Sequence, residues 1–305
     1  MIDSHIHLSR IQYQGEFPYL TFKEDKYSIE RGTLDELIQQ FITAGIYACI
    51  EPGIEINTNE MILALADKYK GFLFPAVGVH PTRTFRFLSY DDHGVSSVQR
   101  LTWEQRSILE KCAASPEVVA IGETGLDYHL ELTEQHRTHQ KMWFIYQLIL
   151  AHRLKLPVIL HIRDADDDAL EILQRYRELL HGGVCHCFTG SAETAHRYTD
   201  LDLRLGIGGA LLIDSPNQRE LEQAVALTPL EYLFLETDSP YVKPTCSDFT
   251  KRQLQKARNT SLILPAVAKR IAELKNISAA EVMRITAENT VRLFRLQNRL
   301  KYPVR

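Results

Sequence analysis

The sequence has few cysteines and no long apolar run, and these two absences exclude whole classes of protein. Its five cysteines are an odd number and mostly lie inside apolar segments, which argues against a disulfide framework and for buried thiols. No apolar stretch approaches the roughly 18 residues of a membrane span. The first residues also lack the basic and apolar regions of a signal peptide. We therefore expect a cytoplasmic protein without membrane contact.

An excess of charge of one sign is missing as well. The 35 lysines and arginines nearly balance the 39 aspartates and glutamates, for a formal net charge of −4. A net charge this small does not indicate binding of nucleic acid or membrane through the overall charge of the protein. Any site for a polyanion must therefore be a local cluster of basic residues. The sequence contains no GxSxG nucleophile elbow, no Walker loop and no HExxH motif, which removes several common enzyme classes.

Short apolar runs rich in β-branched residues alternate with stretches of helical period, which is typical of βα units and a parallel sheet. Eight such units in one uninterrupted chain predict an α/β fold: a single TIM-type (β/α)8 barrel domain spanning residues 1–305, with an additional C-terminal helix. The strands are expected near Ile2–His7, Tyr47–Glu51, Leu73–His80, Val118–Glu123, Pro157–His161, Gly183–Cys187, Arg204–Gly208 and Tyr232–Thr237. The helices are expected near Leu34–Ala44, Asn57–Lys68, Trp103–Ala113, Glu134–Arg153, Ala165–Leu180, Ala192–Tyr198, Pro216–Ala226, Leu262–Leu274 and Ala279–Arg299.

Two connections are longer than normal loops, Ser9–Thr33 after the first strand and Pro81–Thr102 after the third. Unstructured loops of this length inside a domain are usually functional or act as lids. Both follow the carboxyl ends of strands, the face on which TIM barrels build their active sites. We therefore expect both loops at the rim of an active site.

Nearly every predicted strand ends in a side chain that can bind a metal. A lone histidine is usually structural, but five at strand ends have no common structural cause. His5 and His7 are two residues apart, so on an extended strand they share one face and can bind a single ion. The candidates for metal ligands are His5, His7, His80, Glu123, His161, His186 and Asp238.

Two carboxylates among these candidates suggest catalytic roles. Glu123 ends an apolar strand, where an unpaired carboxylate is costly and a bridge between two cations would compensate it. Strand alternation places Glu236 inward, one layer beneath Asp238. Glu236 then either orients a ligand or water, or pairs with a neighbouring strand residue.

The segment Cys185-His186-Cys187 could also suggest a metal thiolate site. On a strand, however, alternate residues face opposite sides, so both cysteines should point away from the face of His186. We therefore expect thiols that bind no metal.

Six motifs, in this order, resemble the TatD family of metal-dependent deoxyribonucleases, within the metal-dependent hydrolase superfamily. The resemblance extends from Met1 to the segment Glu288–Phe294 and so covers almost the whole chain. The motifs are DSHIHL at 3–8, GVHP at 78–81, GETGLDY at 122–128, LPVILHIRDA at 156–165, HCFTGS at 186–191 and LETDSPY at 235–241.

The resemblance implies two divalent metal ions bridged by Glu123. One would be held by His5, His7, Glu123 and Asp238, and the other by Glu123, His161 and His186. Histidine and carboxylate ligands suit zinc or manganese, and the resemblance also implies activity with magnesium. The family positions around the scissile group match His80, Asp127, Tyr128 and Arg163. Arg163 suits a phosphate or a developing oxyanion, although a salt bridge to Asp164 or to a neighbouring carboxylate is the alternative.

The function implied is hydrolysis of phosphodiester bonds of DNA, exonucleolytically from single-stranded or frayed ends. Two cations would activate a water that Asp238 orients or deprotonates, with Glu123 as the other catalytic carboxylate. An amide or ester hydrolase, such as an aminoacyl-tRNA deacylase, is the alternative because the fold does not select the bond. A binding module without catalysis is disfavoured because every ligand position is kept. The sequence does not set the oligomeric state, and a monomer is compatible with it.

Basic and aromatic residues in the loops point to a nucleic-acid strand as partner. Aromatic side chains stack unpaired bases while basic side chains follow the phosphates. A packed lid with a solvated basic rim is the alternative. The residues concerned are Arg83, Phe85, Arg86, Phe87 and Tyr90 after the third strand, and Lys251, Arg252, Lys256 and Arg258 after the eighth.

Overall fold

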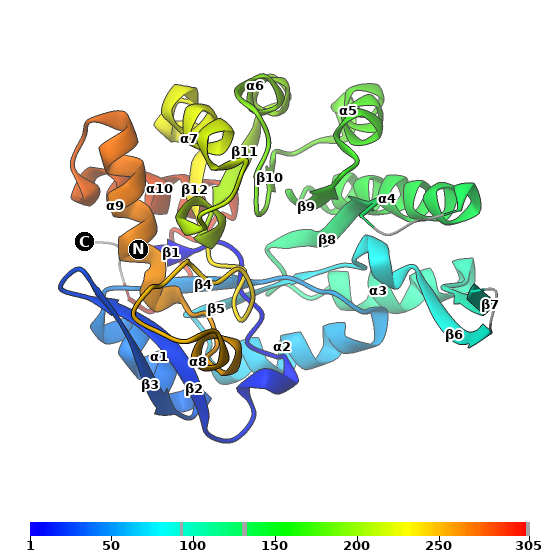
Figure 1. The fold of residues 1–305 in the computed structure, drawn as a ribbon. Coiled ribbons are helices and arrows are strands. Elements are labelled where there is room, and N and C mark those ends of the chain that lie inside the picture. Colours follow the sequence, from blue (N-terminus) through cyan, green and yellow to red (C-terminus); the bar gives the residue numbers. More distant parts are fainter. Residues whose placement is uncertain (92–93, 130–132, 303–305) are drawn as a thin grey trace. The chain divides into compact units, whose positions relative to one another are not determined.

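The computed structural model describes residues 1–91, 94–129 and 133–302, without the side chains of residues 86–100. Eight strands belong to one sheet, and their order in the sheet is their order in the chain (Figure 1). These strands are β1 (Ile2–Asp3), β4 (Ala48–Glu51), β5 (Leu73–Val77), β8 (Ala120–Asp127), β9 (Val158–Arg163), β10 (Gly183–Cys185), β11 (Leu203–Ile207) and β12 (Leu233–Leu235).

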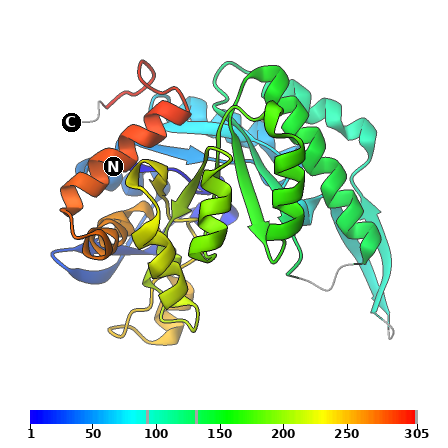
Figure 2. The same cartoon turned by 90° about the horizontal axis from the view of Figure 1, so that it is seen from above.

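At least one helix follows each strand of this sheet, and it comes before the next strand of the same sheet where there is one. They are α1 (Leu34–Thr43), α2 (Asn59–Lys68), α3 (Arg106–Ala113), α4 (Glu134–Leu154), α5 (Asp166–Arg175), α6 (Ala192–Thr199), α7 (Gln218–Leu227) and, after β12, α8 (Lys251–Lys256) and α9 (Leu264–Lys275). A parallel bridge joins Ile6, beyond β1, to Ser239, beyond β12, so the first and last strands are also neighbours. The additional helix α10 (Ala279–Leu293) packs against α9 and β12 (Figure 2). The predicted (β/α)8 barrel with a further C-terminal helix is confirmed.

The chain forms two compact units. The first comprises Met1–Glu51, Leu65–Phe74 and Val184–Arg305, and the second comprises Pro52–Ala64 and Pro75–Gly183. The single domain expected from the sequence stays a prediction. In the described part of the chain, no helix is long and apolar enough to cross a membrane, and the cytoplasmic location also stays a prediction.

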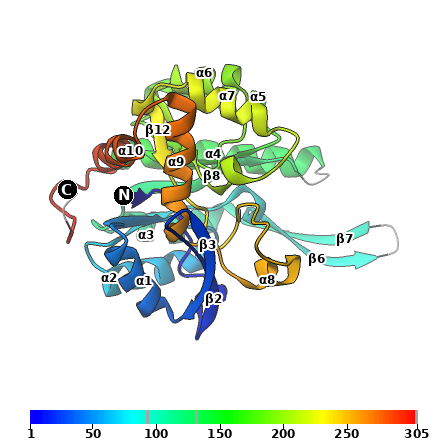
Figure 3. The same cartoon turned by 60° about the vertical axis from the view of Figure 1, so that its left-hand side comes forward.

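The two long connections are not the unstructured loops expected from the sequence. Each contains an antiparallel hairpin (Figure 3). β2 (Phe17–Lys23) pairs with β3 (Lys26–Gly32), and β6 (Phe85–Asp91) pairs with β7 (Gly94–Arg100). In the first hairpin the turn residues Glu24 and Asp25 both have positive φ, 50° and 60°, as a type I′ turn requires. That turn usually carries Asn or Gly, so Glu-Asp gives little sequence signal for it.

Several predicted boundaries were wrong in a way that matters for the site. β1 ends at Asp3, not at His7, and β12 ends at Leu235, not at Thr237. β8 continues to Asp127, and all eight of its residues are buried. The C-terminal helix ends at Leu293, short of the predicted Arg299. The candidate metal ligands that follow β1 and β12 therefore lie beyond the regular backbone hydrogen bonds of the sheet.

Buried amide side chains replace part of that ladder in the second unit. On α4, Gln147 accepts a hydrogen bond from the Val79 N–H at 2.8 Å and donates to the Val79 carbonyl at 3.1 Å. Two turns earlier, Gln140 does the same for the backbone of Asp127, at 2.9 and 3.1 Å. Asn59 of α2 clamps the backbone of Gly78 in the same two-way manner. These clamps fix the backbone next to His80 and at Asp127.

Replacing Gln147 with leucine should destabilise the protein, because the buried N–H and C=O of Val79 would lose their partner. Each buried backbone group left unsatisfied costs about 1 to 3 kcal/mol, so we expect a loss of about 2 to 4 kcal/mol. The free energy of unfolding from urea titration measures it. Gln174→Leu, on the exposed face of α5, is the matched control and should change little. Equal stability of the two variants would contradict the role of the clamp.

Candidate metal centre

The first unit brings His5, His7 and Asp238 together around one point. The Nε2 atoms of His5 and His7 are 3.1 Å apart. Oδ1 of Asp238 lies 3.3 Å from Nε2 of His7 and 3.7 Å from Nε2 of His5. All three ligand atoms lie within 4.8 Å of one another. Two imidazole nitrogens and one carboxylate oxygen form a donor set that suits zinc or manganese.

The charge state of Asp238 fits this arrangement. Burial alone would raise the pKa of its carboxyl group, but the hydrogen bond from His7 and the charges of His186 and His5 outweigh burial and lower the pKa below its ordinary value. The carboxylate is therefore ionised at neutral pH. Its backbone is left-handed, with φ of 50°, and is held there by a hydrogen bond from the Asp238 N–H to the His5 carbonyl at 3.0 Å. Such strain in a non-glycine residue is typical of functional sites.

His186 and Glu236 extend this group. The ring of His186 stacks on that of His5, with centroids 3.8 Å apart. Glu236, only 1% exposed, has Oε1 3.8 Å from Nδ1 of His186 and accepts a hydrogen bond from the Cys187 N–H at 2.5 Å. Gly206 makes room for this carboxylate, since a Cβ there would lie 1.9 Å from Oε2 of Glu236. Glu236 thus lies inward beside a candidate ligand, where it can orient the imidazole.

Asp3 fixes the backbone on which these ligands stand. Its carboxylate is fully buried and accepts hydrogen bonds from the N–H of His5 (3.2 Å), from the N–H and hydroxyl of Thr237 (3.1 and 2.6 Å), and from the hydroxyl of Ser261 (2.6 Å). Burial raises the pKa of Asp3 to about 6, although the four hydrogen bonds oppose this shift. One side chain therefore ties the segment after β1 to the segment after β12.

The second unit brings together His80, Glu123 and His161, again with ligand atoms within 4.8 Å of one another. Oε1 of Glu123 lies 3.3 Å from Nδ1 of His161 and 3.7 Å from Nε2 of His80. The other ring nitrogen of His161 lies 3.0 Å from Oδ2 of Asp127. A carboxylate behind a metal-ligating histidine is the usual arrangement that fixes the tautomer and orientation of the ring.

His161 and Asp127 shift each other's titration. Burial lowers the pKa of His161, but the hydrogen bonds and charges of Asp127 and Glu123 outweigh it and raise this pKa to about 9. For Asp127, burial raises the pKa, and the hydrogen bond and charge of His161 more than reverse the shift. Without a metal, His161 is therefore an imidazolium between two carboxylates. A cation that binds Glu123 and His161 must displace this proton.

His80 is held differently from a ligand. Its Nδ1 accepts a hydrogen bond from the Thr82 N–H at 3.1 Å, so in the neutral ring the proton resides on Nε2. Nε2 is the atom that faces Glu123. A ring nitrogen that keeps its proton donates a hydrogen bond instead of binding an ion, and this arrangement suits His80 to a substrate oxygen.

Tyr128 and Arg163, the other residues expected near the substrate, have different surroundings. The hydroxyl of Tyr128 donates to Oδ2 of Asp168 at 2.7 Å, and the guanidinium of Arg137 lies 4.6 Å from its ring. Arg163 is exposed at the end of β9. Asp164, the alternative partner of Arg163, pairs with His129 at 2.9 Å. The roles of Tyr128 and Arg163 stay predictions, as do the ligand sets that combine residues of the two units.

The basic loop residues divide into structural and unassigned ones. The guanidinium of Arg258 donates to the carbonyls of Gln12, at 3.1 Å, and of Lys256, and Arg83 lies 3.6 Å from Glu55. Lys251, Arg252 and Lys256 are exposed on α8. The side chains of Arg86, Phe87 and Tyr90, which the sequence suggested for base stacking, lie outside the described residues.

The cysteines take no part in the metal-capable groups of the described residues. β10 ends at Cys185, which is buried. Cys187 has a φ of 47°, so the strand alternation assumed through Cys187 was wrong. Its backbone N–H donates a hydrogen bond to Oε1 of Glu236.

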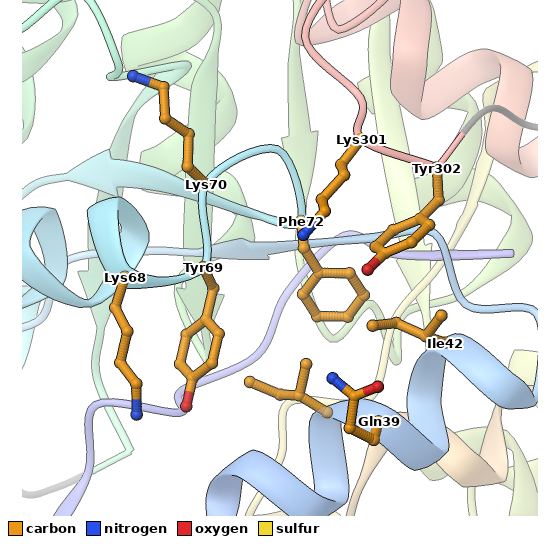
Figure 4. Close-up of a pocket in the computed structure, with 9 residues that line it drawn as sticks. Gln39, Ile42, Lys68, Tyr69, Lys70, Phe72, Lys301 and Tyr302 are labelled. Carbon is orange, nitrogen blue, oxygen red and sulfur yellow. The ribbon is translucent and has the colours of Figure 1, made fainter.

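A surface cavity of about 80 Å³ in the first unit contains none of these residues. Phe72, Tyr302 and Lys301 line it together with Gln39 and Ile42 of α1 (Figure 4). Lys68, at its edge, pairs with Asp35 at 2.9 Å. The chemistry-bearing side chains therefore lie outside this cavity, beyond the carboxyl ends of the strands.

Comparison with known proteins gives one consistent result. The model of the family described as TatD related DNase matches residues 2–295. A metal-dependent hydrolase of Bacillus subtilis, YabD, is 30% identical over 97% of this chain and 99% of its own length. The 3'-5' ssDNA/RNA exonuclease TatD of Escherichia fergusonii is 33% identical over 85% of this chain and 92% of its own.

The crystal structure of YJJV, a TatD homologue from Escherichia coli K12, superimposes with a TM-score of 0.75 and 27% identity, and covers 97% of this chain and 98% of that one. Together with the groups of histidine and carboxylate side chains near the strand ends, these matches show that the chain is an enzyme of the TatD family of metal-dependent hydrolases.

Proposed function

We propose that this enzyme hydrolyses phosphodiester bonds of DNA, removing nucleotides from single-stranded or frayed ends. The convergence of His5 Nε2, His7 Nε2 and Asp238 Oδ1 carries the proposal, because these three donor atoms can hold a cation and one of them belongs to an ionised carboxylate. Relatives named 3'-5' ssDNA/RNA exonuclease, 31 to 33% identical to this chain, support the choice of substrate.

In this proposal His5, His7 and Asp238 would hold one divalent ion, and Glu123 with His161 would hold another, with zinc, manganese or magnesium as candidates. The donor sets fit such ions, since each combines imidazole nitrogen with carboxylate oxygen. Divalent ions supply Lewis acidity at a phosphoryl oxygen and favour deprotonation of water near neutral pH. The bridging role of Glu123 that the family resemblance implies is part of the proposal.

The chain's own groups have separate tasks. Asp238 is ionised and next to His5 and His7, so it orients the attacking water and accepts its proton. His80 presents Nε2–H and donates a hydrogen bond to an oxygen of the scissile phosphate. Asp127 holds the ring of His161 in one orientation through the contact at 3.0 Å.

Asp238→Asn should abolish hydrolysis while leaving the fold intact, because the amide keeps the shape but neither carries the charge nor accepts the proton. We expect a fall in kcat/KM of at least about 100-fold on a 5'-labelled single-stranded oligonucleotide, measured by gel electrophoresis with added Mn²⁺. Asp214→Asn, an exposed carboxylate of the same unit, is the control and should retain activity.

The substrate class is tested in the same assay. Wild-type protein should shorten the oligonucleotide stepwise and leave an aminoacyl ester intact. Cleavage of the ester alone would transfer the assignment to the amide or ester hydrolases, and a D238N variant with full nuclease activity would contradict the role of this carboxylate.

Metal affinity at the second group should depend on pH because of the raised pKa of His161. In the metal-free protein the ring keeps its proton below a pKa of about 9. Affinity should therefore rise by up to about tenfold per pH unit and level off above that pKa, as a fluorescent chelator competing for Mn²⁺ would report. Asp127→Asn should flatten this dependence, whereas the exposed Asp67→Asn should not.

The raised pKa of His161 also makes the stability of the metal-free protein depend on pH. The pKa of His161 is raised above its ordinary value of 6.5. The contribution of this residue to the free energy of unfolding is therefore fully present below the pKa of His161 in the unfolded chain, and it is lost as the pH rises through about 9. Unfolding titrations of the metal-free protein across this range check it. If the stability of D127N depended on pH as that of the wild type does, Asp127 would not be the cause of the raised pKa of His161.

A further inference from the structure

An exposed tyrosine lies next to the first group of candidate ligands. Tyr241 is 37% exposed, and its ring centroid lies 6.2 Å from that of His7, with the planes inclined by 64°. Its backbone N–H donates to the carbonyl of Asp238 at 2.8 Å, so the two residues belong to one tight turn. Among the described residues nothing accepts a hydrogen bond from, or donates one to, the Tyr241 hydroxyl.

The backbone of this turn is fixed by buried groups. The side chain of Asn259, fully buried, donates to the carbonyls of Thr237, at 2.9 Å, and of Val242, at 3.1 Å. Gly209 lets the Val242 carbonyl approach, since a Cβ at Gly209 would lie 2.0 Å from that oxygen. Buried hydrogen bonds thus hold the turn on both sides of Tyr241. Its large side chain is not needed to anchor the turn.

We propose that Tyr241 stacks on the nucleobase of the nucleotide whose phosphate reaches His5, His7 and Asp238. The assignment rests on the proposed nuclease function and adds a residue that recognises the base. An aromatic face of this kind stacks any base, so it gives affinity with little sequence preference. A ring on the same turn as Asp238 places the base beside the reacting phosphate and thereby selects a nucleotide over a bare phosphodiester.

The experiment compares a natural single-stranded oligonucleotide with one that carries abasic residues at both ends, for wild type and variants. Tyr241→Ala should lower kcat/KM on the natural strand between about fivefold and one hundredfold. It should have little effect on the abasic strand, which offers no base to stack. Tyr241→Phe keeps the ring and should retain the preference for the natural strand.

Tyr241→Leu keeps apolar bulk without an aromatic face and should behave like the alanine variant, so the test stands even if the alanine variant fails to fold. Tyr302→Ala, in the separate cavity of Figure 4, is the remote aromatic control and should match wild type. Bound metal, measured by atomic emission, should be equal in all variants.

Two results would overturn the assignment, and they differ from each other. If Y241A and Y241L slow both strands equally, the ring supports the turn and does not stack a base, although the nuclease function holds. If wild type cleaves neither strand while it is loaded with metal, the nuclease function itself is wrong and the stacking role falls with it.

Discussion

The site depends on how buried backbone groups are satisfied where the strands stop. A buried N–H or C=O without a partner costs as much as a lost hydrogen bond, and β1 has two residues while β12 has three. Asp3 supplies the missing partners after both strands, through the N–H groups of His5 and Thr237. In the second unit the amides of Gln147 and Gln140 do the same for Val79 and Asp127. Because these clamps replace the ladder, the chain can leave strand geometry and bring the candidate ligands of each unit close together.

The two groups of candidate ligands differ in their electrostatics before any cation binds. Asp238 is an ionised carboxylate among imidazoles, with its pKa lowered by His7, His186 and His5 after burial has raised it. His161 is an imidazolium between carboxylates, with its pKa raised to about 9. Asp238 therefore needs to lose no proton of its own to accept a cation, whereas binding at the second group must release the proton of His161.

The sequence predicted the fold class, because alternating periods follow from backbone geometry, and it indicated that residues at strand ends would lie close together. His5, His7 and Asp238 meet even though the strands are shorter than expected. Other features give no such signal. Gln140 and Gln147 look like polar helix-surface residues, and only the packing of α4 shows that they are buried. The β2–β3 hairpin was missed because its turn uses Glu24 and Asp25.

Asp238 and Tyr241 share one turn, and this arrangement couples chemistry to recognition. The hydrogen bond between the Tyr241 N–H and the Asp238 carbonyl prevents either residue from shifting alone. Asn259 holds both ends of the turn through Thr237 and Val242, and the Thr237 side chain reaches Asp3. A base stacked on Tyr241 would therefore be positioned relative to the same framework that aims the Asp238 carboxylate. Positioning of this kind lowers the barrier without adding a reacting group, because the orientation of phosphate and water is set when the strand binds.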